Sequence, residues 1–232
     1  VVDVKKVVVA GGGVLGTQIG LMCAYQGFDT TFWLRSESSI GRTQPKIERY
    51  SALMLEDLMK AKALIGNPMG AFMYPKGMIR EWNGITAEKI DEMAEEAKKR
   101  FAENVHIELD MAAAVKDAYI VIESMSENPE AKIGVYTAMK DLLDEDTILV
   151  TNSSTLLPSM FAEYTGRPEK YCSLHFANTI WKNNTAEIMG HAGTDPETFQ
   201  KVVAFAADIG MVPLQLHKEQ PGYILNSMLV PF

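Results

Sequence analysis

The 232-residue sequence has few cysteines and no cluster of positive charge. Its two cysteines, Cys23 and Cys172, are too few for a disulfide framework, and reduced thiols suit the cytosol, so we expect a cytoplasmic protein. Lysine and arginine number 22 against 30 aspartates and glutamates, which gives a net charge of −8. We therefore expect neither nucleic acid nor an anionic membrane surface as a partner.

Long hydrophobic runs are also scarce. Residues 7–28 carry no charge over a length that would span a bilayer, but six glycines fall inside this stretch. That glycine content favours a buried strand followed by a helix over a membrane helix. No small-residue cleavage site follows a long apolar core, as it would in a signal peptide. The sequence therefore predicts no membrane segment.

Short apolar strands alternate with helices along most of the chain. Strands are predicted at residues 6–10, 30–34, 105–109, 118–123, 148–151, 171–176, 187–189 and 212–216. Helices are predicted at residues 13–26, 86–101 and 128–143, and from Asp195 to Gly210. This alternation is typical of the α/β class and predicts a Rossmann-type, doubly wound and mostly parallel sheet.

A helical hairpin is inserted after the second predicted strand. Its first helix has one apolar face, made of Ile47, Tyr50, Met54, Leu58, Ala61 and Ile65. A loop rich in glycine and proline leads to its second helix, at residues 86–101. Residues 221–229 are apolar and helical, with nothing after them to pack against. We expect a dinucleotide-binding domain at 1–216 and, at 217–232, the first helix of a helical C-terminal domain.

The sequence GGGVLG at residues 11–16 fits the pattern G-x-G-x-x-G directly after the first strand and at the start of a helix. Gly11 permits the tight turn, Gly13 lets a pyrophosphate approach the backbone, and Gly16 allows close packing of helix and strand. The phosphates would bind at the helix N-terminus. A glycine-rich turn without a ligand is the alternative. The predicted loop residues are Gly11, Gly13, Val14, Leu15 and Gly16.

The second strand does not end in the acidic residue that usually binds the ribose 2′-hydroxyl of NAD. Arg35 and Ser36 follow it instead. A guanidinium group and a hydroxyl can hold a 2′-phosphate through charge-assisted hydrogen bonds, so the sequence favours NADP over NAD as cofactor. The alternative is that Arg35 stacks on the adenine or faces water.

A histidine and a glutamate occupy consecutive strands. His175 ends one strand, and Glu187 follows twelve residues later on the next. The segment between them is turn-like, so the strands can lie side by side. A carboxylate on one ring nitrogen fixes the histidine tautomer and stabilises the imidazolium that forms when the other nitrogen takes a proton. The pattern predicts an acid/base pair, with a surface pair as the alternative, and no metal site is predicted.

Several motifs together, over nearly the whole chain, resemble the 3-hydroxyacyl-CoA dehydrogenase family. They are Glu123-x-x-x-Glu127-Asn128 before Lys132, Asn152-Ser153-Ser154, His175-Phe176-x-Asn178, Glu187, and Pro221-Gly222-x-x-x-Asn226. The resemblance implies an oxidoreductase that interconverts a 3-hydroxyacyl-CoA and a 3-oxoacyl-CoA with a nicotinamide cofactor. It also implies a homodimer formed through a helical C-terminal domain.

The resemblance also implies roles for individual residues. His175 is the general acid/base, and Glu187 orients it. Ser154 bonds the reacting oxygen, and Asn226 helps to hold the substrate. Three further residues are expected to lie along the cofactor, namely Glu127, Lys132 and Asn178.

Three alternatives remain open. The segment around Trp181 and Lys182 departs from the family pattern. The first alternative is therefore a related NAD(P)-dependent reductase whose substrate is a non-CoA hydroxy acid, sugar acid or diketone. Tyr136-x-x-x-Lys140 resembles the catalytic pair of short-chain dehydrogenases, although Gln18 stands where their loop has its last glycine. The third alternative is a non-catalytic dinucleotide-binding protein.

Overall fold

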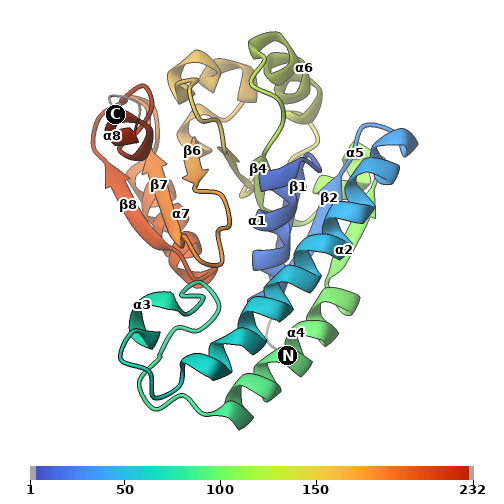
Figure 1. Ribbon diagram of the computed structural model, residues 1–232. Helices are drawn as coiled ribbons and strands as arrows, with labels where there is room; N and C mark the ends of the chain where they lie inside the picture. The colour runs from blue at the N-terminus through green and yellow to red at the C-terminus, as the bar shows by residue number, and fades with distance from the viewer. Residues whose placement is uncertain (1–3, 230–232) are drawn as a thin grey trace.

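The computed structural model describes residues 4–229 and contains one eight-stranded sheet with helices on both faces (Figure 1). The strands are β1 (Lys6–Ala10), β2 (Asp29–Trp33), β3 (Val105–Glu108), β4 (Ala118–Glu123), β5 (Ile148–Thr151), β6 (Tyr171–Phe176), β7 (Thr185–Met189) and β8 (Val212–Leu216). Their order is β3-β2-β1-β4-β5-β6-β7-β8, and β6 and β7 form the antiparallel pair in an otherwise parallel sheet. The predicted Rossmann-type, mostly parallel sheet is confirmed.

The helices divide between the two faces of the sheet. They are α1 (Val14–Tyr25), α2 (Glu37–Lys60), α3 (Gly70–Met73), α4 (Ala87–Glu103), α5 (Met111–Val115), α6 (Pro129–Met139), α7 (Pro196–Asp208) and α8 (Leu225–Leu229). Because side chains alternate along a strand, Val7 and Val9 pack with α1, α2, α4 and α7, whereas Val8 and Ala10 pack with α5 and α6. No helix in residues 4–229 is long and apolar enough to cross a membrane.

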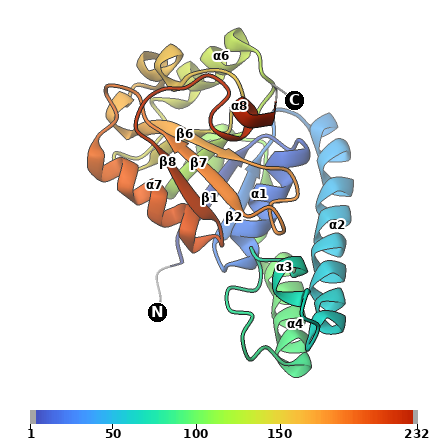
Figure 2. The same cartoon turned by 60° about the vertical axis from the view of Figure 1, so that its left-hand side comes forward.

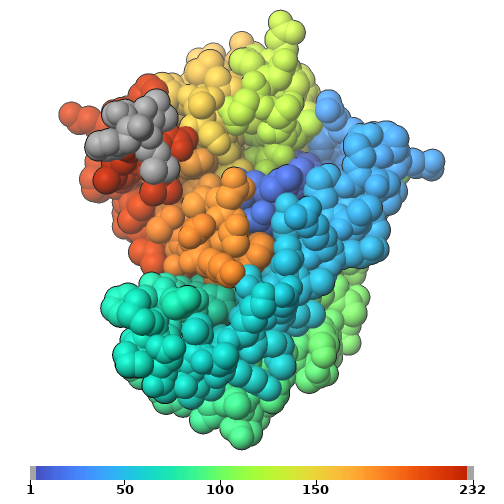
Figure 3. All heavy atoms as spheres, in the orientation of Figure 1, coloured from blue at the N-terminus to red at the C-terminus, as the bar shows by residue number. Residues whose placement is uncertain are grey.

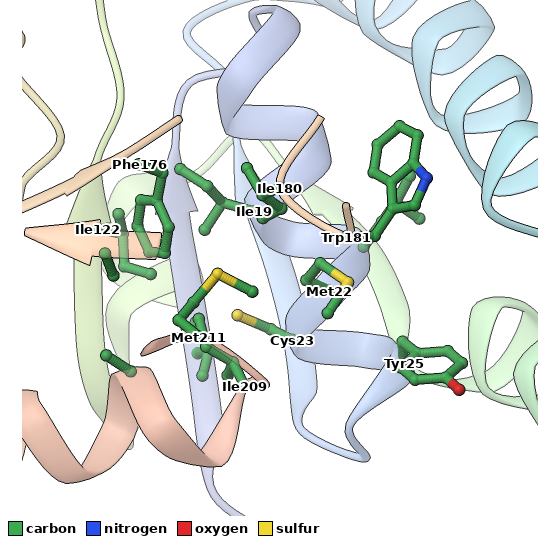
Figure 4. Close-up of a cluster of buried hydrophobic side chains, with 14 of the residues drawn as sticks. Ile19, Met22, Cys23, Tyr25, Ile122, Phe176, Ile180, Trp181, Ile209 and Met211 are labelled. Atoms are coloured by element: carbon green, nitrogen blue, oxygen red, sulfur yellow. The ribbon is translucent and has the colours of Figure 1, made fainter. Parts of the chain in front are cut away.

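The larger core joins α1 to the segment that follows β6. Figure 4 shows side chains of α1, among them Ile19 and Met22, gathered with Phe176, Ile180 and Trp181. Trp181 is buried, and its carbonyl accepts a hydrogen bond from the backbone N–H of Gly77 at 3.0 Å. Burying a large apolar side chain contributes about 1.5–3 kcal/mol, so this packing holds the chain beyond β6 firmly against α1.

The predicted helical hairpin is present, and α2 and α4 extend together beyond the sheet (Figures 1 and 2). Its expected apolar face holds as far as Ala61, but the expectation that Ile65 belongs to it is wrong, because that side chain is 38% exposed. The chain changes to a 3-10 helix at Ala61–Leu64. A 3-10 helix has 3.0 residues per turn instead of 3.6, so the face rotates away from the core.

Two helices differ in extent from the prediction. α6 ends at Met139 instead of Leu143, because the chain tightens into a turn in which the backbone N–H of Leu142 bonds to the carbonyl of Met139. α8 begins at Leu225 instead of residue 221, because Gly222 and Tyr223 have φ angles of 78° and 54°, which a right-handed helix excludes. The last predicted residues, 230–232, lie outside the described part of the chain.

Candidate active site

A cavity of about 640 Å³ lies where the strand order reverses between β1 and β4. Ligands of doubly wound sheets bind at such a switch point. Figure 3 shows the blue N-terminal segment set in a hollow between α2 and α6. The lining includes residues 124–127 after β4, and Asn152 and Ser154 after β5. All five predicted loop residues also line it, namely Gly11, Gly13, Val14, Leu15 and Gly16.

The three glycines of the motif face different surroundings. A Cβ atom on Gly11 would lie 2.4 Å from the carbonyl oxygen of Ser124, and one on Gly16 would lie 2.7 Å from the carbonyl oxygen of Gly11. A Cβ atom on Gly13 would meet no atom within 4 Å. The fold itself therefore requires glycine at 11 and 16. At Gly13, which opens α1, the space is free for a ligand.

Three basic side chains line the same cavity. Arg35 follows β2, and Arg42 and Lys46 lie one turn apart near the start of α2. Arg42 and Lys46 were not predicted as site residues, although their spacing of four residues places them on one helical face. Ser36 does not line the cavity, since its hydroxyl lies 3.0 Å from that of Ser38 in the first turn of α2. The cavity therefore offers a cluster of positive charge at the end of β2.

The antiparallel register of β6 and β7 pairs His175 directly with Glu187. The two side chains are buried, and Nδ1 of His175 lies 2.9 Å from Oε2 of Glu187. Because the carboxylate accepts, Nδ1 carries the proton, and the lone pair is on Nε2. In the part of the chain that the structure describes, Nε2 has no hydrogen-bond partner. The pair is arranged for proton exchange through Nε2.

The loop after β5 is organised by Glu127. The Glu127 carboxylate accepts hydrogen bonds from the Ser153 hydroxyl at 2.7 Å, the Ser154 backbone N–H at 3.1 Å and the Thr155 hydroxyl at 3.1 Å. The side-chain amide of Asn226 donates to the carbonyl of Ser154 at 3.4 Å. Two predicted site residues, Glu127 and Ser154, thus line the cavity, and Asn226 contacts Ser154 from outside the lining.

Asn152 connects this cavity to the strand that carries His175. Its Oδ1 accepts a hydrogen bond from the backbone N–H of Phe176 at 3.2 Å, and its Nδ2 donates to the hydroxyl of Ser124 at 3.4 Å. The side chain therefore ties the ends of β4, β5 and β6 together. Asn152 belongs to the Asn152-Ser153-Ser154 motif, but the motif alone did not predict this role.

Two predicted cofactor residues lie elsewhere. Lys132 is fully buried on the inner face of α6, where its ammonium group pairs with Glu123 of β4, so it does not line the cavity. Asn178 is exposed and lines a second cavity, which shares Val14 with the first. The chain turns away there, since Thr179 has a φ of 58°. Lys132 and Asn178 thus lie outside the lining of the first cavity, Lys132 in the core beneath it and Asn178 next to it, and their expected place along the cofactor stays a prediction.

The short-chain dehydrogenase alternative requires an accessible Tyr136. That side chain is buried in α6, where its hydroxyl donates to Oε2 of Glu123 at 2.9 Å. Burial raises the pKa of Tyr136 well above its usual value, so the phenol stays protonated. Tyr136 has no access to the cavity, and this alternative is excluded.

Comparison with known proteins gives consistent matches. A family model described as "3-hydroxyacyl-CoA dehydrogenase, NAD binding domain" matches residues 75–220. A solved diketoreductase, reported for substrate-directed dual catalysis of dicarbonyl compounds, is 38% identical with a TM-score of 0.79, over 100% of this chain and 70% of that chain. The fatty acid oxidation complex subunit alpha of Idiomarina loihiensis is 36% identical over 119 residues.

That alignment covers 51% of this chain and 16% of the Idiomarina protein, so the match spans about one sixth of the curated relative. The (S)-3-hydroxybutyryl-CoA dehydrogenase of Ralstonia eutropha is 21% identical with a TM-score of 0.75, over 99% of this chain and 69% of that chain, and it shares the fold. The family model covers more than half of the sequence, and the resemblance inferred from the motifs is confirmed. The chain belongs to the 3-hydroxyacyl-CoA dehydrogenase family of oxidoreductases.

Proposed function

We propose that this chain carries the nucleotide site and the acid/base pair of an enzyme that interconverts a 3-hydroxyacyl-CoA and a 3-oxoacyl-CoA. The observation that carries the proposal is the buried contact of 2.9 Å between Nδ1 of His175 and Oε2 of Glu187. Ser154, which lines the glycine-rich cavity, and Asn226, which bonds to the Ser154 carbonyl, are the groups proposed to hold the substrate oxygen.

The cavity residues fit a nicotinamide dinucleotide. A volume of about 640 Å³ lies within the range of cofactor sites, about 300–1,000 Å³. The open space at Gly13, next to the free N–H groups that begin α1, suits a pyrophosphate. When bound, the nicotinamide ring supplies the atom that accepts or donates the hydride.

The protein's own contribution is proton transfer and orientation. In the oxidation direction, Nε2 of His175 takes the proton of the substrate hydroxyl, and in reduction it returns that proton to the new hydroxyl. Glu187 stabilises the imidazolium through Nδ1. Ser154 and Asn226 orient the oxygen relative to Nε2, so the chain supplies geometry and electrostatics around the reacting carbon.

We propose NADP as the preferred cofactor. Arg35, Arg42 and Lys46 supply three positive groups to the cavity. The residue before Arg35 is the buried Leu34, so no carboxylate ends β2. A 2′-phosphate would gain charge-assisted hydrogen bonds here, whereas the free 2′-hydroxyl of NAD would lack its usual acceptor.

A reductase of dicarbonyl compounds without CoA is the second candidate. It is favoured by the diketoreductase, which is 38% identical over the whole chain, compared with 21% for the hydroxybutyryl-CoA dehydrogenase. The acid/base chemistry at His175 would be the same in both candidates. The difference between them lies in the group that carries the oxo function.

One assay tests both candidates. Nicotinamide oxidation is followed in the full-length protein with acetoacetyl-CoA or 2,4-pentanedione as substrate, and with NADPH and NADH in parallel. Turnover with acetoacetyl-CoA supports the first candidate, and turnover with the free diketone alone supports the second. Loss of turnover in His175→Ala with unchanged cofactor affinity excludes the non-catalytic alternative, and full turnover in that variant overturns the proposed role of His175.

The domain organisation and assembly are also proposals. We propose that residues 1–216 form the dinucleotide-binding domain and that residues from 217 onward begin a helical C-terminal domain through which a cytoplasmic homodimer forms. α8 is the element that supports the second domain, and residues 230–232 lie outside the described part of the chain. Light scattering of the full-length protein tests the dimer.

A further inference from the structure

Tyr223 lies against the acid/base pair without a role in the reaction described above. Its ring stacks on the imidazole of His175, with centroids 4.5 Å apart and planes 21° apart. The side chain is 1% exposed, and its hydroxyl donates to the carbonyl of Ser153 at 2.7 Å. Burial raises the pKa of Tyr223, so this hydroxyl keeps its proton and remains a donor. One side chain thus connects the imidazole to the loop that carries Ser154.

The backbone at Tyr223 is held in an unfavourable conformation. Its φ of 54° is in the left-handed region, which bulky side chains rarely adopt. Such a conformation persists only where the surroundings determine it. Here the next two backbone N–H groups, of Ile224 and Leu225, donate to Oε1 of Glu187 at 2.8 and 2.9 Å. Glu187 therefore binds His175 with one oxygen and fixes the turn of Tyr223 with the other.

These contacts constrain the imidazole in two ways. The hydrogen bond to Glu187 fixes the Nδ1 edge of the ring but allows it to tilt about that bond. The stacked ring of Tyr223 covers one face and limits the tilt, and its hydroxyl sets the position of that ring relative to the Ser153–Ser154 loop. The direction of Nε2 is therefore coupled to the position of Ser154.

We propose that Tyr223 is a positioning residue that holds the imidazole of His175 and the Ser154 loop in register, so that Nε2 and the Ser154 hydroxyl meet the same substrate oxygen. The inference rests on the proposed function, because it assumes that His175 exchanges the proton. It goes further by assigning a catalytic consequence to a hydroxyl that bonds to the backbone carbonyl of Ser153.

Two variants separate the ring from its hydroxyl. Tyr223→Phe keeps the stack and loses the link to Ser153, whereas Tyr223→Leu loses both. Because small misplacements of reacting groups slow catalysis strongly, we expect kcat to fall about tenfold in Tyr223→Phe and about a hundredfold in Tyr223→Leu. We expect KM for the nicotinamide cofactor to change much less than kcat, since the two groups that Tyr223 contacts, the His175 ring and the Ser153 carbonyl, belong to residues outside the lining of the cofactor cavity.

Tyr25→Phe is the matched control. The buried Tyr25 hydroxyl also donates to a backbone carbonyl, that of Met78 at 3.2 Å, but it lies at the far end of α1 from the glycine loop. We expect the Tyr25→Phe variant to lose about as much stability as Tyr223→Phe and to keep the wild-type kcat.

Proton NMR of labelled histidine supplies a second readout, because the ring of Tyr223 shields the His175 protons. That shielding persists in Tyr223→Phe and disappears in Tyr223→Leu.

The results distinguish this inference from the proposed function. If His175→Ala keeps its turnover, the proposed function fails whatever the Tyr223 variants do. If His175→Ala is inactive but Tyr223→Phe keeps wild-type kcat, the positioning role is overturned and the proposed function stands. An equal loss of kcat in Tyr25→Phe also overturns it, because the effect would then be general destabilisation. If Tyr223→Leu does not fold, the comparison of kcat in Tyr223→Phe and Tyr25→Phe still tests the positioning role.

Discussion

The ammonium group of Lys132 lies 2.8 and 2.9 Å from the two carboxylate oxygens of Glu123, and both side chains are 1% exposed. Glu123 also accepts hydrogen bonds from the hydroxyls of Tyr136 and Thr151 and from the backbone N–H of Met125. The carboxylate ends β4 immediately before the residues that line the cavity. The buried ion pair therefore fixes the end of β4, from which the lining residues 124–127 continue.

Removing the cation from this pair should destabilise the fold. Lys132→Met leaves the Glu123 charge buried without its partner, and we expect the free energy of unfolding to fall by about 3–5 kcal/mol. Urea denaturation followed by circular dichroism measures it. Lys89→Met is the control, since the exposed pair of Lys89 with Glu92 should contribute about 0–1 kcal/mol. Equal losses in the two variants would contradict the structural role of Lys132.

Glu187→Gln should abolish turnover without unfolding the protein. The amide oxygen can still accept the N–H groups of Ile224 and Leu225, which turns the amide NH₂ toward Nδ1 of His175. Nδ1 must then accept, so the proton moves to Nε2, the wrong tautomer for taking a proton from an alcohol. A loss of kcat of about 10⁴-fold is typical of such a tautomer change. Steady-state kinetics measure kcat, and a thermal melt checks that the variant is folded. A near-normal kcat would rule out the proposal that the Glu187 carboxylate sets the tautomer of His175.

The motif glycines should respond differently to alanine. Gly16→Ala forces a Cβ atom against the carbonyl of Gly11 and should lower the melting temperature. Gly13→Ala meets no protein atom, so the fold should keep its stability, whereas the cofactor Kd should rise about tenfold if the pyrophosphate approaches the backbone there. Calorimetric titration measures Kd. An unchanged Kd in a folded Gly13→Ala protein would place the phosphates elsewhere.

The basic cluster should determine the choice between the two dinucleotides. Loss of a charge-assisted hydrogen bond costs about 1.5–3 kcal/mol, so Arg35→Gln and Arg42→Gln should each raise KM for NADPH at least about tenfold and leave KM for NADH unchanged. Arg49→Gln is a control on the same helix, because Arg49 lines the second cavity. The proposed 2′-phosphate site would be contradicted if the wild-type protein used NADH as efficiently as NADPH. It would also be contradicted if the variants raised KM for NADPH and KM for NADH by the same factor.

Much of the fold was predictable because its strands are locally distinct. The predicted bounds of β1, β4, β5, β6 and β8 match the structure, since each is a short, largely apolar segment with a clear break at its ends. The pairing of His175 with Glu187 was predictable for a related reason. A turn-like segment between two strands leaves few registers, and the observed register joins these two residues.

The contacts that refine the site were not predictable from local patterns. Tyr223 stands 48 residues beyond His175, and its left-handed φ carries no glycine or asparagine signal. The burial of Lys132 depends on how α6 packs on β4, whereas the sequence shows only a polar residue at a helical position. In each case packing between distant elements determines the role, and spacing along the chain does not report it.

Stability should fall as the solution becomes alkaline. Burial raises the pKa of Cys172 and of Tyr25 to about 12, from usual values of 9.0 and 10.0. It also raises the pKa of Cys23, Tyr136, Tyr171 and Tyr223. The folded protein thus keeps protons that the unfolded chain releases above about pH 9. The unfolded state binds fewer protons in this range, so the free energy of unfolding decreases as pH rises.

Urea denaturation at pH 7.5 and pH 10 measures this decrease. A thiol reagent at pH 8.5 tests its cause separately, because the buried and protonated Cys23 and Cys172 should react only after urea is added. Cys172→Ala should reduce the slope of stability against pH, since it removes one of the groups whose pKa differs between the two states. Equal stability at both pH values, or fast reaction of the thiols in the folded protein, would contradict the burial of these groups. The change of stability with pH depends on the protons bound by the folded and the unfolded protein. The prediction can therefore be tested in the absence of cofactor and substrate.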